Sequence, residues 1–115
     1  RYSPLWMFRG ATNFIRVYED PAFFLYLAPP LARANPALGT NGFVVPSLGD
    51  YARQPWPAPE RARAAQIAFL DKWVGEFMDS LRARKLEEET VIVFTSATGP
   101  RRQAGSDPGF FQSAG

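Results

Sequence analysis

The chain has 115 residues, of which 46% are hydrophobic and 15% aromatic, a composition typical of a folded domain that excludes a largely disordered chain. The formal net charge is only +2, from 13 basic and 11 acidic residues, so nucleic acid is not an expected partner. The sequence contains no cysteine and no histidine, which excludes disulfides, thiolate metal sites and the commonest general base.

The chain opens with an apolar and aromatic stretch over residues 1–8. Its side chains include Leu5, Trp6, Met7 and Phe8. A free terminus seldom exposes such residues. They are therefore expected either to pack on this domain or to dock on another chain or a further part of this one, and both alternatives stay open.

Residues 9–19 predict a helix, because apolar side chains recur there at spacings of three and four and form one face. These side chains are Ala11, Phe14, Ile15 and Tyr18. The pair Asp20-Pro21 is expected to end the helix, since proline disfavours helical geometry in the residue before it.

Residues 22–28 form a continuous apolar run, which is typical of a strand buried on both faces of a parallel sheet. No run in the chain approaches the ~20 apolar residues that cross a bilayer, so no transmembrane segment is expected. Residues 29–59 hold many prolines and glycines and predict a long irregular loop, which aromatic side chains would hold on the surface.

Residues 60–85 predict the longest helix. Pro59 and Glu60 suit its first turn, and basic residues crowd its carboxyl end, where the helix dipole favours cations. An apolar stripe at helical spacing marks the face that we expect in the core: Ile67, Leu70, Val74, Phe77, Met78 and Leu81.

Residues 90–95 are rich in β-branched side chains and predict a second buried strand. Strand, helix and strand in this order form a βαβ unit, so the expected fold is α/β, with parallel strands, flanking helices and a long loop. Ligands bind at the carboxyl ends of such strands. The turn at that end offers Ala97 and Thr98, which are poor catalytic and metal-binding groups.

Four stretches resemble the sulfatase family of the alkaline-phosphatase-like superfamily. They are residues 23–28, residues 35–51, the pairs Leu-Asp at 70–71 and Val-Gly at 74–75, and the strand and glycine turn at 90–99. The similarity runs over about residues 9–112. With residues 96–115 as a polar tail, the resemblance implies that residues 1–115 form one partial, truncated sulfatase-like domain.

The resemblance also implies a site that these residues no longer support. Family members hold calcium with an Asp-Asn pair where this chain has Ala97 and Thr98, and they place a histidine where it has Arg33. The family's Cys/Ser-x-Pro-x-Arg motif, which supplies a formylglycine nucleophile, does not occur in this sequence. We therefore expect no catalytic residue, no metal site and no cofactor. An exported or periplasmic location follows from the resemblance alone.

Three functions remain as alternatives. The favoured one is a non-catalytic, sulfatase-derived accessory subunit, a pseudoenzyme that docks in a hetero-assembly or homo-oligomer, for example as an extrinsic subunit of a membrane complex. The apolar residues at positions 5–8 would then dock on the partner. The second is a fragment of a sulfatase-like hydrolase acting on sulfate esters. The third is a residual anion-binding module, in which Arg33, Arg101 and Arg102 either grip an anion or are simply solvated.

Overall fold

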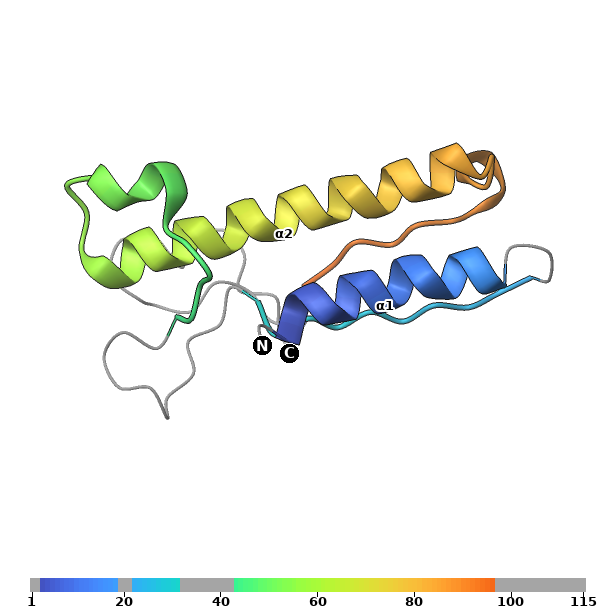
Figure 1. Cartoon of the computed structure of the whole chain (residues 1–115), viewed down its shortest axis with the longest axis horizontal. Coiled ribbons are helices and arrows are strands. Elements are labelled where there is room, and N and C mark those ends of the chain that lie inside the picture. The colour runs from blue at the N-terminus through green and yellow to red at the C-terminus, as the bar shows by residue number, and fades with distance from the viewer. Residues whose placement is uncertain (1–2, 19–21, 32–42, 97–115) are drawn as a thin grey trace.

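The computed structural model of the chain describes residues 3–18, 22–31 and 43–96 (Figure 1). Its two α-helices are α1 (Ser3–Val17) and α2 (Ala58–Ala83). Two short 3-10 helices flank α2, with η2 (Gly49–Arg53) before it and η3 (Glu87–Glu89) after it. The part of the chain that the structure describes contains no strand. The expected α/β fold with parallel strands is therefore wrong, and the architecture is helical.

Helix α1 begins earlier than the helix predicted at 9–19, and the reason lies in its first turn. Pro4 follows the first helical residue, where its fixed φ suits a helix and its missing N–H has no intrahelical partner to lose. The helix therefore includes the apolar residues at positions 5–8. Its buried side chains recur at spacings of four and three: Pro4, Phe8, Ala11 and Ile15.

Helix α2 ends in a left-handed turn. The Lys85 backbone has a φ of 60°. Its N–H donates to the carbonyl oxygen of Arg82 at 3.0 Å, and the N–H of Leu86 donates to that of Leu81 at 3.0 Å. These two hydrogen bonds form a Schellman motif, which satisfies carbonyl groups of the last turn and reverses the chain.

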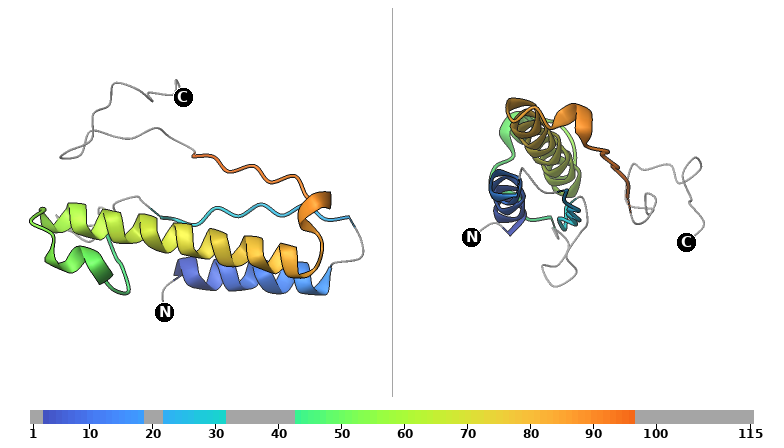
Figure 2. Two further views of the ribbon diagram at one scale, coloured as in Figure 1. Left: turned by 90° about the horizontal axis from the view of Figure 1, so that it is seen from above. Right: turned by 90° about the vertical axis from the view of Figure 1, so that its right-hand side faces the viewer.

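The two helices lie side by side and run in the same direction, with the core between them (Figures 1 and 2). Ile15 and Leu81 are fully buried there. The Trp73 ring lies 5.7 Å from that of Phe8, centroid to centroid, so an aromatic contact joins the helices. The buried face of α2 includes Trp73 and small residues and is rotated from the predicted stripe, of which Ile67 is 48% exposed.

Part of the predicted loop 29–59 is held against α2. The amide Nε2 of Gln66 donates to the carbonyl oxygen of Val44 at 3.0 Å. Arg61 Nη1 donates to the carbonyl oxygen of Ala52, in η2, at 2.9 Å. Because these contacts come from two turns of α2, residues 44–52 follow the helix surface.

Residues 22–31 and 90–96 are extended but are not strands. Each follows a helix and runs back along it, so the two segments point in the same direction (Figures 1 and 2). An extended segment becomes a strand only when its backbone hydrogen-bonds to a neighbour. The predictions of strands at 22–28 and 90–95 are wrong for that reason: the side chains favour an extended backbone, but no described segment pairs with either one.

Candidate functional site: an exposed apolar surface

The two extended segments carry half of the large apolar side chains that the described residues leave exposed, including the most exposed ones. The exposed fraction is 88% for Phe24 and 79% for Tyr26 in the first segment, and 91% for Val91, 80% for Val93 and 72% for Phe94 in the second. Globular domains rarely expose apolar groups of this size together. We call these five side chains, which belong to two separate segments, the exposed apolar surface.

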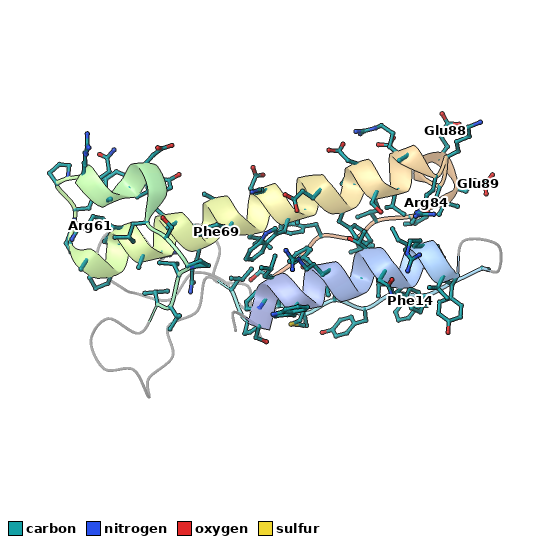
Figure 3. All side chains as sticks on the ribbon, in the orientation of Figure 1. Phe14, Arg61, Phe69, Arg84, Glu88 and Glu89 are labelled. Carbon is teal, nitrogen blue, oxygen red and sulfur yellow. The ribbon has the colours of Figure 1, made fainter. Side chains whose placement is uncertain are left out.

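The segment 22–31 is positioned by alternate side chains. Phe23, Leu25 and Leu27 are half-buried, whereas Phe24 and Tyr26 are exposed. The Phe23 ring meets the Phe14 ring of α1 edge-on, at a centroid distance of 6.1 Å and an angle of 82°. Phe14 lies on the side of α1 that borders this segment (Figure 3). One row of side chains therefore fastens the segment to the helices, and the other row faces outward.

The segment 90–96 is positioned by the turn that follows α2. The hydroxyl of Thr90 donates to the carbonyl oxygen of Leu86 at 2.7 Å, which fixes the chain as it leaves η3. Every side chain from residue 91 to residue 96 is exposed. The turn thus directs this segment back along the molecule, where Val91, Val93 and Phe94 stay largely exposed.

The backbones of both segments have unused hydrogen-bonding capacity. Within residues 22–31 and 90–95, the one backbone hydrogen bond between described residues joins the N–H of Leu31 to the carbonyl oxygen of Pro29 at 2.8 Å. Residues 22–30 and 91–95 therefore make no backbone hydrogen bond to another described segment. An unpaired apolar backbone of this kind is a template for pairing with another extended chain.

A charged pair, Arg82 and Glu87, lies in the turn that precedes the second segment. The Arg82 guanidinium donates to both carboxylate oxygens of Glu87, from Nε at 2.9 Å and from Nη2 at 2.8 Å. These hydrogen bonds, together with the attraction between the opposite charges, lower the pKa of Glu87 and raise that of Arg82. The pair therefore links the end of α2 to η3 and stabilises the turn between them.

The predicted docking residues near the start of the chain do not form one surface. Phe8 is buried against Trp73, and Leu5 and Met7 are half-buried. Trp6 is exposed and lies below the guanidinium of Arg9, whose Cζ is 5.4 Å from the ring centroid. Helix formation explains this division, because consecutive residues of a helix point in different directions.

The remaining predicted site residues lie outside the described residues. They are Ala97 and Thr98 of the altered metal positions, and Arg33, Arg101 and Arg102 of the candidate anion site. The predictions for all of them stay predictions. Within residues 3–18, 22–31 and 43–96, no three carboxylate, imidazole or thiol side chains gather as metal ligands would. Over the same residues, neither helix combines the length and the hydropathy that a membrane crossing needs.

Two residues that shape the structure were missed in the sequence. Trp73 belongs to a second periodic set on α2, with Ala62, Ala65 and Phe69, and this set could have been found because its spacings are three and four. Gln66 is buried on the same face. Its burial could not be recognised in the sequence, because the amide is satisfied by the carbonyl group of Val44, which is distant in the sequence.

Comparisons with known proteins identified no relative of this chain. No protein-family model matches the chain, no curated protein matches it, and no solved structure matches it. The resemblance to the sulfatase family is thus neither supported nor refuted by these comparisons. The function must therefore be inferred from the fold and from the exposed apolar surface.

Proposed function

We propose that the chain is a non-catalytic structural subunit that docks in a larger protein assembly through the exposed apolar surface. The observation that carries the proposal is the pair of extended segments, 22–31 and 90–95, which run in the same direction and keep large apolar side chains exposed. The altered residues Ala97 and Thr98 at the expected metal positions support the non-catalytic part.

The energy available from covering this surface is large enough for docking. Each fully covered valine or phenylalanine contributes about 1.5–3 kcal/mol. Association costs on the order of 4–15 kcal/mol in lost freedom of motion. One such side chain would not offset that cost, whereas the five of the exposed apolar surface together can.

The partner that suits this surface is an extended, apolar protein segment. Its side chains would cover the exposed row of Phe24 and Tyr26, and its backbone would take up the unused N–H and carbonyl groups. Such a segment can come from a different protein, from a second copy of the chain, or from further residues of the same polypeptide. Each of these three sources predicts a different mass for the intact assembly, so a mass measurement distinguishes them.

The first experiment is native mass spectrometry of the protein purified from its own source. The expected result is a chain held in a complex with other subunits. A longer polypeptide that contains this sequence and is otherwise alone would show that the surface is covered within one chain. Neither subunit docking nor a structural role in an assembly would then stand.

The second experiment asks whether the exposed apolar surface makes the contact. The variant Val91→Thr/Val93→Thr removes apolar groups that touch little of the described chain, so helix content measured by circular dichroism should not change. Recovery of the companion subunits should fall strongly. Val17→Thr is the matched control, because Val17 is also exposed but lies outside both segments. Equal recovery with both variants would contradict the proposal.

A further inference from the structure

A groove runs between α1 and α2 on the flank of the helix pair away from the extended segments. Its volume is about 630 Å³. On α2 its walls come from Phe69, Lys72 and Glu76, whose spacings of three and four place them on one flank of the helix. Phe14, on the other flank of α1, faces segment 22–31 instead. The groove is therefore a surface separate from the exposed apolar surface.

The floor of the groove is aromatic. Phe8 and Trp73 are buried at its base, and the Phe69 ring stacks on Trp73 with a centroid distance of 5.4 Å and an angle of 25°. Leu5 adds an aliphatic group to the lining. Such a floor can receive a bulky apolar side chain, and the volume lies in the usual range for ligand sites, roughly 300–1,000 Å³.

The rim of the groove is basic. Arg9, Arg16 and Lys72 line it, against the single carboxylate of Glu76. The Lys72 Nζ and Glu76 Oε1 atoms are 3.7 Å apart with both side chains largely exposed, so this ion pair is weak and easily exchanged. The groove therefore keeps a net positive charge.

The two arginines are held without a carboxylate partner. Arg16 Nη2 donates to Oδ1 of Asn13 at 2.7 Å, and a neutral amide leaves the arginine's charge uncompensated. Arg9 lies over the ring of Trp6. Among the described residues, neither guanidinium is part of an ion pair. Arg16 is thus held beside Asn13, which also lines the groove, and both guanidinium groups keep a charge that can bind an anion.

We propose that this groove binds an acidic peptide segment of a partner protein, with one bulky apolar side chain of that segment on the aromatic floor. The carboxylates of the segment would pair with Arg9, Arg16 and Lys72, while the apolar side chain lies against Phe69 and Trp73. Charge complementarity selects the acidic segment, and the aromatic floor selects its apolar anchor. The proposal does not rest on the proposed function, since it concerns different residues.

The test uses the full chain and a short, blocked, dye-labelled peptide of glutamates around one central leucine. Fluorescence anisotropy should show saturable binding that weakens with salt. Replacing the glutamates of the peptide by glutamines, or its leucine by alanine, should weaken binding in each case. The variant Arg9→Gln/Arg16→Gln should weaken it by about tenfold, which corresponds to two exposed charge-assisted contacts.

The matched control is Arg53→Gln/Lys85→Gln, which removes the same charge from exposed positions outside the groove and should bind like the unaltered chain. Equal weakening in both double variants would reveal nonspecific charge attraction and overturn the proposal. So would the absence of saturable binding. Circular dichroism checks that each variant keeps its helices.

Two other occupants would also overturn the proposal. Glu88 and Glu89 extend from the tip of the molecule beyond α2, so a second copy could offer them to the groove (Figure 3). Self-association in the ultracentrifuge that Glu88→Gln/Glu89→Gln and Arg9→Gln/Arg16→Gln both abolish would assign the groove to that copy. Binding to anionic lipid vesicles, lost in the arginine variant and without peptide binding, would assign it to a membrane surface.

Discussion

The helix pair and the extended segments are both rich in apolar side chains, but only the helix pair buries them. Ile15 of α1 and Leu81 of α2 are fully buried, whereas Val91 and Val93 of the second segment are almost fully exposed. A helix satisfies its own backbone hydrogen bonds and needs only one neighbour for its apolar face. An extended segment needs a neighbour for its backbone as well. The comparison shows that an apolar sequence indicates that a segment must be buried, but does not indicate which segment or partner buries it.

The largest expected effect on stability comes from comparing a substitution in the helix pair with one in an extended segment. Ile15→Ala removes a fully buried side chain and should lower the free energy of unfolding by about 2–5 kcal/mol, because a cavity remains. Val93→Ala removes a side chain that is already in solvent and should change it by less than about 0.5 kcal/mol. Urea unfolding followed by circular dichroism measures both. Similar losses in the two variants would mean that the second segment is covered within the chain.

The next effect concerns Gln66, the one polar residue that is buried among the described residues. Gln66→Glu replaces the amide donor to Val44 with a carboxylate, so two oxygens face each other without a proton between them. The expected loss is about 1–3 kcal/mol at neutral pH, measured by urea unfolding. Gln66→Met, which has a similar shape but no charge, should lose less. A Gln66→Glu variant as stable as the parent chain would contradict the hydrogen bond.

A smaller effect, in the stabilising direction, is expected at the end of α2. Lys85 has a left-handed backbone, which is unfavourable for any residue with a Cβ atom. Lys85→Gly should therefore raise the free energy of unfolding by about 0.5–1 kcal/mol. Lys85→Ala keeps the Cβ atom and should bring no gain. If alanine and glycine gave the same stability, the left-handed turn would not be present in solution.

The smallest effect is the pH dependence of the turn after α2. The hydrogen bonds from Arg82 lower the pKa of Glu87 in the folded chain. The folded state therefore binds this proton less tightly than the unfolded state, and the pair's contribution is present above the ordinary pKa of glutamate and is lost as the pH falls through the lower folded value. An NMR titration should show the Glu87 pKa rising in Arg82→Gln. An unchanged value would exclude the pair.

The helices could be predicted from the sequence because their signals are local. Apolar spacing over 60–85 and Pro59 near the start of the helix depend only on near neighbours, and α2 covers Ala58–Ala83. The start of α1 was harder to predict, because the apolar residues at 5–8 fit either a docking segment or a helix. The turn at Lys85 gave no signal, because glycine usually occupies that position.

The exposed apolar surface could not be predicted, because exposure depends on which segments meet. The strands predicted at 22–28 and 90–95 are wrong, because a strand requires a paired neighbour and the described residues supply none. The groove between the helices was hidden for a related reason. Arg9 and Lys72 are distant in the sequence, and only the packing of α1 on α2 brings them to one rim.

The parallel course of the two helices also has a kinetic consequence. Since α1 and α2 run in the same direction, the chain must return along the molecule before the second helix can begin, and the contact between Phe8 and Trp73 joins distant parts of the sequence. Helix α1, with 15 residues, is marginal in water on its own, so it is not stable until that loop closes. Closing the loop costs chain entropy before any core contact forms. The return path between the helices, more than the helix propensity of either, should therefore set how fast this chain folds.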